Sequence, residues 1–553
     1  MIFSTLFCFL TLVSLFGYSY LFKKFTNNHE STVILNQDIF FGIFTIIFLS
    51  LLLNFFLPLK YFSIPLFIFG IICFVIGYQK NLYRIKLHYY FIFILFINFI
   101  SFYNGPNVDS PMYHLQTMNW MILHKINLGI ANLNIRFGLN SSWHSFLALM
   151  NISNNYLSTK FYLSSVIFSI VCYEVASKKK SFSLSDVYLF LAISFLITYS
   201  FLHPFVNGPI LNQLGNPEND TVAMLLYIFV LYFYLKINES SNQNKNYLIN
   251  LFIILVFFSI SVKISNASLI FLLILIIITN KNYKLFCISN VLVFFATAFW
   301  FLRSFLISGC LVYPIAIKAL CVNTMWTNLF QADLHGKVIQ SFARDTRLRD
   351  KYMNFDYTLN SNDWFLPWVN DYFLNTAILK ISSLLFLFSF FILCLFFVYE
   401  YFKKGNVKIN YNIIFISCFF LVSAYIWFKA PEVRFGSGFI ISLPCFFLAL
   451  IFHKFINLNY LSSRNVMICI FVLFFLLSMK HFRKFELKHL VQNNRNNSNY
   501  SNISKIGTFD GVEIYHSSNS QCGDFPKICV NTKKDSYKII SKFNYRIFLS
   551  DNK

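Results

Sequence analysis

Long apolar runs recur along this chain, and they constrain its fold more than any other feature. Each run holds roughly 16 to 24 residues, and at 1.5 Å per helical residue it can cross about 30 Å of hydrocarbon. The first run has no basic segment before it and no small-residue cleavage site before Lys23, so we interpret it as a span and not as a signal peptide. We predict about fourteen transmembrane helices, over residues 2–21, 36–57, 61–79, 88–103, 156–176, 186–203, 220–236, 247–264, 266–280, 285–302, 376–401, 410–428, 435–453 and 465–480.

The composition agrees with an all-α polytopic membrane protein in a lipid bilayer. Of the 553 residues, 57% are hydrophobic and only 12% are charged, too few polar residues to cover one soluble core. Lys and Arg number 45 against 22 Asp and Glu, a net charge of +23. In a polytopic protein this excess is typical of basic cytoplasmic loops that face anionic lipid, and we expect no nucleic-acid partner.

Basic residues in alternate short loops predict the orientation. By the positive-inside rule these loops are cytoplasmic. They contain Lys23, Lys24, Lys80, Arg84, Lys86, Lys178, Lys179, Lys180, Lys236, Lys245, Lys281, Lys284, Lys403, Lys404, Lys408, Lys454 and Arg464. Both termini and the long segments 104–155, 204–219 and 303–375 are then expected on the extracytoplasmic side.

The C-terminal residues 481–553 differ in composition from the multi-span region 1–480. A polar stretch at 492–504 precedes the strand-like pieces 511–515 and 537–540. We interpret the tail as a linker followed by a small extracytoplasmic α/β or β module.

Two cysteine pairs stand apart from those inside apolar runs. Cys522 and Cys529 lie in the tail, which is an oxidising location if the predicted orientation holds, so a short-loop disulfide is favoured over free thiols. Cys310 and Cys321 form a second, weaker candidate pair. Neither pair has the spacing of a zinc site, and no metal site is predicted.

Acidic residues border the spans in two external segments. Asp109 precedes Ser110 and Pro111, a good helix N-cap, but a carboxylate at this boundary could instead act as general base for an incoming hydroxyl. Tyr113 or His114 would then supply a hydrogen bond. Further along, Glu218 and Asp220 either cap the next helix or provide a second acidic position.

Three cations lie near the same predicted membrane face. Lys263, Arg303 and Arg434 each occur beside apolar or aromatic residues near the end of a span. They could be snorkelling or interfacial anchors, or they could contact a phosphate, for which arginine is well suited. No P-loop, GxGxxG, GxSxG or HExxH motif has a suitable context, so an external active site would take its activated group from a lipid carrier.

Together these motifs resemble the GT-C superfamily of integral-membrane glycosyltransferases, in particular a bacterial branch of multi-span proteins. The resemblance is carried by residues 109–115, 138–143, 216–220, 262–265, 308–314, 430–436 and 521–529. It implies a GT-C-like helical fold in the bacterial inner membrane, a catalytic acid at the start of the first long extracytoplasmic loop, and a polyprenyl-phosphate-linked sugar as donor. The acceptor would be a lipid or a glycan, and no cofactor is firmly predicted.

On this resemblance Asp109 matches the loop acid and is the predicted catalytic base. We assign further catalytic roles to His114 and Asp220, and donor-phosphate contacts to Lys263, Arg303 and Arg434. Substrate contacts are expected from Tyr113, Trp143 and Glu218.

Two other functions remain open. An O-antigen-type polymerase or ligase would use a lipid diphosphate glycan in place of a lipid monophosphate sugar. A flippase for lipid-linked oligosaccharides would need polar residues facing a cavity at mid-membrane depth, whereas the predicted spans are nearly free of charge at their centres.

Overall fold

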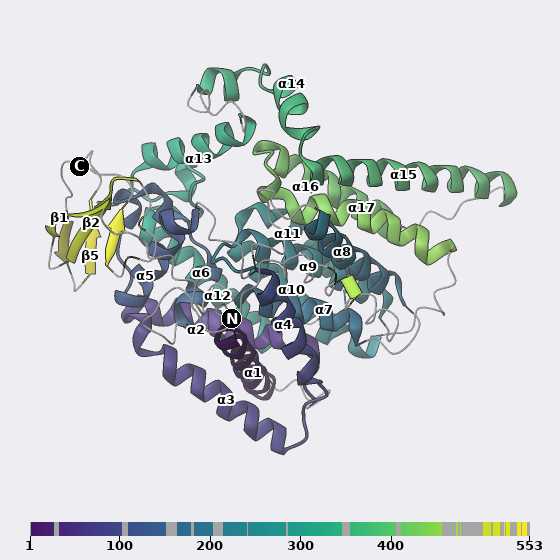
Figure 1. Cartoon of the computed structure of the whole chain (residues 1–553), viewed down its shortest axis with the longest axis horizontal. Coiled ribbons are helices and arrows are strands. Elements are labelled where there is room, and N and C mark those ends of the chain that lie inside the picture. Colours follow the sequence, from purple (N-terminus) through teal and green to yellow (C-terminus); the bar gives the residue numbers. More distant parts are fainter. Residues whose placement is uncertain are drawn as a thin grey trace.

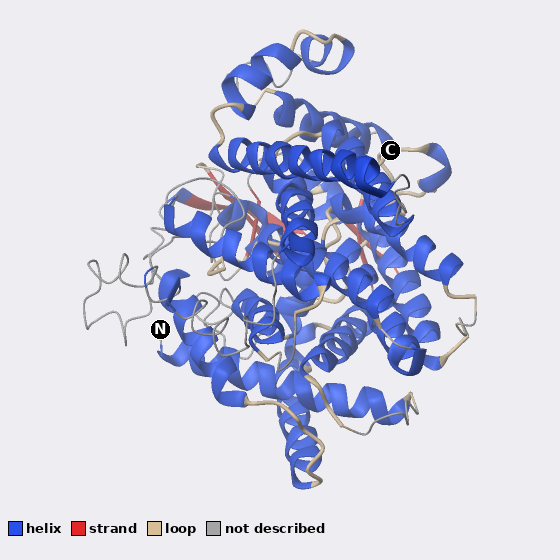
Figure 2. Ribbon diagram, turned by 90° about the vertical axis from the view of Figure 1, so that its right-hand side faces the viewer, coloured by secondary structure: helices blue, strands red, loops and turns tan. Residues whose placement is uncertain are grey.

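The protein is mostly helical, with a small group of strands near its C-terminus (Figures 1 and 2). The computed structural model describes residues 2–26, 33–101, 109–150, 163–177, 182–202, 214–240, 242–281, 283, 286–345, 354–404, 411–455, 472–473, 476, 502–509, 512–519, 522, 525, 527–530, 539–542 and 545–549.

Among these described residues, eight helices are long and apolar enough to cross a membrane. They are α1 (Ile2–Phe25), α2 (Ile39–Phe56), α9 (Asp220–Glu239), α10 (Asn242–Val262), α12 (Ile288–Ser308), α15 (Ala377–Lys404), α16 (Tyr411–Lys429) and α17 (Val433–Phe455). Five shorter helices are also apolar: α3 (Ser63–Gln79), α4 (Leu87–Ser101), α7 (Ser164–Ala176), α8 (Leu184–Leu202) and α11 (Leu269–Thr279).

The prediction of a mostly helical fold with helices apolar and long enough to cross a membrane is confirmed, whereas fourteen full spans are not. Each predicted run up to 435–453 overlaps one of the helices above, but five of these helices are short. The run 266–280 shows one reason, because a 3-10 turn over Ile264–Ser268 takes its first residues and α11 begins only at Leu269. The last predicted run, 465–480, lies almost wholly outside the described residues.

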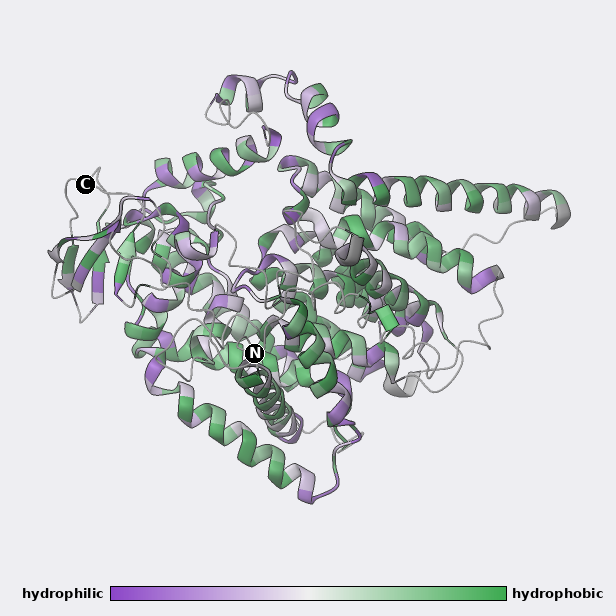
Figure 3. Cartoon of the chain, in the orientation of Figure 1, coloured by the Kyte–Doolittle hydropathy of each residue, from purple (hydrophilic) through white to green (hydrophobic). Residues whose placement is uncertain are grey.

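Apolar side chains face both the interior and the surroundings of the bundle. Helix α9 is the most buried candidate span and packs against α10, α8 and α17. Helices α3 and α15 lie at the periphery and are apolar along their length (Figure 3). Their exposed side chains include Ile64, Ile68, Leu384, Leu387 and Phe391. Such a surface is suited to hydrocarbon and not to water.

Consecutive helices define two ends of the bundle. Helix α9 runs from Asp220 to Glu239, and α10 returns from Asn242 to Val262, so Lys263 comes back beside Asp220. We call this the Asp109 end, because Asp109 lies there too. The opposite end holds Lys236 and is called the Lys236 end.

Short elements cover the Asp109 end. Two stretches of the chain form them. The first contains η3 (Ser110–His114), α5 (Leu115–Leu123), η4 (Ile130–Asn132), η5 (Ile135–Gly138) and α6 (Ser142–Leu149). The second contains η9 (Lys318–Leu320), α13 (Leu329–Arg344), η10 (Asp356–Asn360), α14 (Phe365–Pro367) and η11 (Trp368–Phe373).

The C-terminal strands form a small module, as the tail composition predicts. β1 (Ile503–Phe509) pairs antiparallel with β2 (Val512–Ser517), and β2 pairs parallel with β3 (Ile528–Val530). β4 (Ile539–Lys542) and β5 (Tyr545–Phe548) form a separate antiparallel pair. The predicted strand pieces correspond to β2 and β4, while the polar stretch 492–504 lies mostly outside the described residues.

The module is docked on α5 beside the start of η3 (Figure 1). The backbone carbonyl of Phe525 accepts hydrogen bonds from the side-chain amides of Gln116 and Asn119, both at 3.3 Å. The backbone amide of Cys522 donates to the carbonyl of Pro111 at 3.1 Å. The predicted disulfide between Cys522 and Cys529 closes this loop. The weaker candidate pair, Cys310 and Cys321, also forms a disulfide.

We expect the Cys522–Cys529 disulfide to hold the module against α5. Replacing both cysteines with Ser removes a link between residues seven positions apart. The unfolded chain then gains conformational entropy, which lowers the stability of the folded module by about 2 kcal/mol. Limited proteolysis of the full-length protein in detergent should then release the tail several-fold faster than in the wild type. Serine at both Cys310 and Cys321 is the matched control, since that disulfide lies in another segment. Equal tail cleavage in the two double variants would contradict the expectation.

Candidate functional site

The carboxylate of Asp109 lies among cations. Asp109 occupies the N-cap position of η3, yet its side chain makes no capping hydrogen bond. Instead Arg434 Nη1 donates to Asp109 Oδ2 at 2.6 Å, and Arg136 Nη1 lies 3.5 Å from Oδ1. The Asp109 side chain is 21% exposed, so it stays open to a ligand. Capping therefore does not account for this residue.

A second ion pair joins the first through Arg434. Lys263 Nζ pairs with the carboxylate of Asp220 and also donates to the backbone carbonyl of Arg434 at 2.8 Å. Arg434 Nε donates to Glu432 Oε2 at 2.8 Å. The ring of Phe435 lies below both cations, with 4.7 Å between its centroid and Lys263 Nζ. Arg434 is thus the centre of the arrangement.

We call these six residues the Asp109 cluster: Asp109, Arg136, Asp220, Lys263, Glu432 and Arg434. The chain positions are far apart, and Asp109 and Arg434 are separated by 325 residues. Three acids balance three cations, so the cluster is close to neutral overall. Four of the six were predicted from the sequence as site residues. Arg136 and Glu432 were not, although both lie in segments near the predicted site residues.

Backbone geometry explains how Lys263 reaches Asp220. Helix α10 ends at Val262, and Lys263 adopts an extended conformation before the 3-10 turn. The carbonyl of Val262 accepts hydrogen bonds from Ser141 Oγ at 2.8 Å and Asn219 Nδ2 at 2.9 Å. This break in the helix is fixed by two other segments, so the lysine side chain projects to one place.

Two histidines lie buried behind the cluster. The rings of His114 and His144 have centroids 4.7 Å apart. Burial lowers the pKa of His114 to about 3, with further lowering by Arg434 and Arg136, and it lowers the pKa of His144 well below 6.5. Both are neutral near pH 7, so His114 can orient a neighbour but cannot store a proton there. Burial and Asp109 likewise raise the pKa of Tyr113, which keeps its hydroxyl protonated.

These histidines predict a loss of stability in mild acid. Each folded pKa lies below the unfolded value near 6.5, so the unfolded chain binds protons first as the pH falls. The contribution of each neutral histidine to the free energy of unfolding is fully present above pH 6.5. The free energy of unfolding should fall by about 1 kcal/mol per histidine between pH 6.5 and 5.5. Thermal unfolding in detergent at both pH values measures this. The variant His144→Gln should show a shallower dependence, and an unchanged slope would contradict the prediction.

The structure does not bring every predicted site residue into the cluster. Trp143 is only 1% exposed and packs on Phe146 in the hydrophobic core, so no open surface for substrate exists at its ring. Glu218 is buried as well. Arg303 is buried on α12, where it donates to the side-chain oxygen of Asn140. The substrate contacts of Trp143 and Glu218 and the donor-phosphate contact of Arg303 stay predictions.

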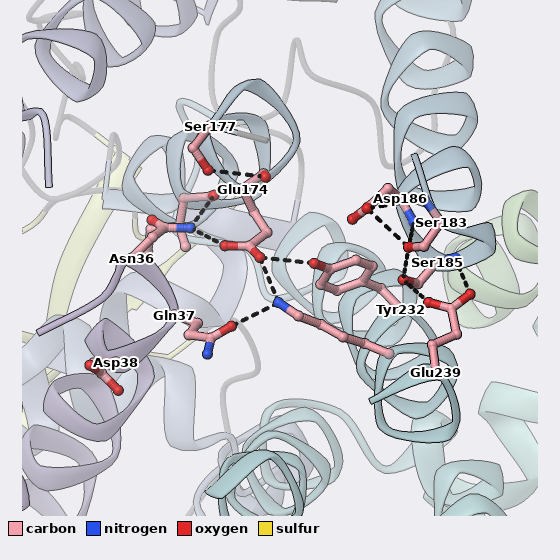
Figure 4. Close-up of polar contacts among 12 residues, drawn as sticks. Asn36, Gln37, Asp38, Glu174, Ser177, Ser183, Ser185, Asp186, Tyr232 and Glu239 are labelled. Atoms are coloured by element: carbon pink, nitrogen blue, oxygen red, sulfur yellow. Dashed lines mark hydrogen bonds and ion pairs between the residues drawn. The ribbon is translucent and has the colours of Figure 1, made fainter. Parts of the chain in front are cut away.

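A second polar cluster, which the sequence analysis did not foresee, occupies the Lys236 end (Figure 4). Glu174 Oε1 accepts from Lys236 Nζ at 2.9 Å and from the Tyr232 hydroxyl at 2.8 Å, while Asn36 Nδ2 donates to Glu174 Oε2 at 2.6 Å. Nearby, Lys23 pairs with buried Asp38 at 3.0 Å. These contacts tie the ends of several helices together. The acids have cationic partners, and the arrangement is that of a structural network.

Within the described part of the chain, no group of three or more His, Cys, Asp or Glu side chains is placed to hold a metal ion. The Asp109 cluster instead offers alternating carboxylates and cations at the end of an apolar bundle. Such an arrangement can bind an anionic group, orient a hydroxyl and accept its proton.

Comparison with known proteins gives one match. A family model described as "Domain of unknown function (DUF8201)" covers residues 1–441. No curated protein and no solved structure matches the chain. The family model covers most of the helical bundle, up to the first part of α17, and all six residues of the Asp109 cluster, and this protein is therefore a member of the DUF8201 family.

Proposed function

We propose that this protein is a glycosyltransferase that moves a sugar from a polyprenyl-phosphate donor to a lipid or glycan acceptor. The Asp109 end would face the extracytoplasmic side of the bacterial inner membrane. The observation that carries the proposal is the Asp109 carboxylate, which two arginines hold in a partly exposed position at the end of a bundle of apolar helices.

The proposed reaction needs a base and a stabilised leaving group. The acceptor hydroxyl attacks the anomeric carbon, a new carbon–oxygen bond forms, and the bond from that carbon to the phosphate oxygen breaks. Asp109 takes the hydroxyl proton, and the electron pair leaves with polyprenyl phosphate. Arg434 and Lys263 would stabilise the phosphate charge that develops. Asp220 would hold Lys263 in place, since these two side chains already pair.

The ion pairs also suggest how donor binding prepares the site. In the structure Arg434 Nη1 donates to Asp109 Oδ2 at 2.6 Å. A donor phosphate that binds Arg434 would compete for this guanidinium. The Asp109 carboxylate would then be released to accept the hydrogen bond of the incoming hydroxyl.

The direct test is incorporation of radiolabelled sugar from polyprenyl-phosphate donors into lipid or glycan, in membranes that contain the wild-type chain. Membranes without the protein are the control. Transfer that depends on the protein supports the proposal. Transfer only from a lipid diphosphate glycan would favour the polymerase or ligase alternative. Translocation of lipid-linked oligosaccharide without transfer would overturn the proposal in favour of a flippase.

A further inference from the structure

A crevice separate from the Asp109 cluster lies between α5, the segment after it and α12. It is partly enclosed and has a cavity volume of about 20 Å³. Arg303, Lys125 and Trp120 line it, and none of its lining residues is acidic. The C-terminal module adjoins the same wall, because Lys125 Nζ lies 4.1 Å from the ring centroid of Tyr545 and Trp120 contacts Phe548 edge to face.

Two buried donors on this wall lack a partner within the described residues. Arg303 is 5% exposed, and its Nε makes no hydrogen bond there. Its guanidinium donates through Nη1 to Asn140, and it pairs with no described carboxylate. The indole Nε1 of Trp120 is also buried without a partner. An unmatched guanidinium and indole N–H are costly unless an acceptor satisfies them.

The charge of this crevice differs from that of the Asp109 cluster. There, carboxylates neutralise the cations, whereas Arg303 and Lys125 carry positive charge with no acid between them. A crevice with one sign of charge attracts the opposite sign. An arginine Nε edge is well shaped for two oxygens of a phosphoryl group.

We propose that this crevice binds a phosphoryl group. Thr117, which lines it, follows Asp109 by eight residues, about two helical turns further along η3 and α5. A donor phosphate is bonded to the reacting carbon and would lie much closer to Asp109. The group in the crevice therefore belongs to the acceptor, so Arg303 would contact an acceptor phosphate and not the donor phosphate predicted from the sequence. The acceptor is then a phosphate-bearing lipid or glycan. This last assignment rests on the proposed function, while phosphoryl binding itself does not.

Binding is measured by calorimetric titration of the purified full-length protein. One arm adds inorganic phosphate in detergent, with chloride at equal ionic strength as reference. The other compares nanodiscs containing phosphatidic acid with nanodiscs of phosphatidylcholine alone. We expect binding in at least one arm. Binding in both identifies the phosphoryl group as sufficient, and binding only to phosphatidic acid identifies a lipid headgroup as the source.

Two variants locate the binding in the crevice. Arg303→Gln and Trp120→Phe should each weaken the affinity at least about tenfold, since each removes a donor to a charged acceptor. Trp120→Phe keeps an aromatic ring in the core and is expected to fold. It therefore tests whether binding occurs in the crevice even if Arg303→Gln does not fold. Lys318→Gln is the matched control, an exposed lysine outside the crevice, and should leave the affinity unchanged. No binding in either arm, or equal affinity in wild type and Trp120→Phe, would overturn the inference. Because the titration does not measure transfer, its result is independent of the glycosyltransferase proposal.

Discussion

The variant Asp109→Asn should insert and fold normally but lose sugar transfer by about 10²- to 10⁴-fold, the usual contribution of a positioned general base. An asparagine oxygen can still accept the hydrogen bond that Arg434 Nη1 donates to Asp109 at 2.6 Å. Arg434 also keeps its contact with Glu432. The geometry is thus largely retained, whereas an amide cannot take the proton of an acceptor hydroxyl at neutral pH.

The measurement is the initial rate of radiolabel transfer in membranes at matched expression, with thermal unfolding as a check on folding. Asp333→Asn is the control, because that carboxylate is about half exposed in an ordinary pair with Lys337 on α13. It should retain wild-type transfer. Full transfer by Asp109→Asn would remove this residue as the base, whatever else the protein does.

Among the variants proposed for this protein, Arg434→Gln should lower the free energy of unfolding the most. This guanidinium pairs with both Asp109 and Glu432, and its removal leaves two carboxylates close together with less positive charge. Removing one partner of a fully buried pair costs about 3–5 kcal/mol, and we expect about 2–3 kcal/mol here because the side chain is 26% exposed. Burial already raises the pKa of Glu432, and loss of Arg434 should raise that pKa further.

Denaturant or thermal unfolding of the purified protein measures the loss. Lys337→Gln removes a cation from an exposed i,i+4 pair and should cost less than about 0.5 kcal/mol. The double variant Arg434→Gln, Asp109→Asn should recover part of the stability, because it removes one of the stranded charges. If Arg434→Gln is as stable as Lys337→Gln, the ion pairs do not hold this end of the bundle together.

Local patterns were enough to predict much of the fold. The apolar runs located the helices, because every span must bury its own backbone and present apolar side chains to lipid. The strands near 511–515 and 537–540 could be predicted because residues that favour β-structure are flanked there by turn residues. Helix lengths were less predictable. The break at Lys263 depends on Ser141 and Asn219, whose hydrogen bonds to Val262 come from elsewhere in the chain.

The candidate site likewise has some residues that local sequence predicts and others that it does not. Asp109, Asp220, Lys263 and Arg434 were identified because each is a charged residue at the end of an apolar run. Their partners Arg136 and Glu432, in contrast, have no local signal that distinguishes them from surface charges.

At the Lys236 end, the ion pairs were not predicted at all. Lys23 and Lys236 were counted only as charges that set the orientation, yet both form ion pairs with acids in other segments. Asp38 and Glu174 interrupt apolar runs, and that interruption was the available sign that buried cations lie nearby. Pairing across many residues is set by tertiary packing, which one sequence does not display.

The docking of the C-terminal module on α5 bears on the order of biosynthesis. Ribosomes make the module after the helices of the bundle, so its hydrogen bonds to Pro111, Gln116 and Asn119 form only after the rest of this end has been synthesised. The segment that begins with Asp109 would lack this backing in every nascent or truncated chain. A chain that lacks the module would therefore hold the segment after Asp109 with fewer contacts than the full-length protein does.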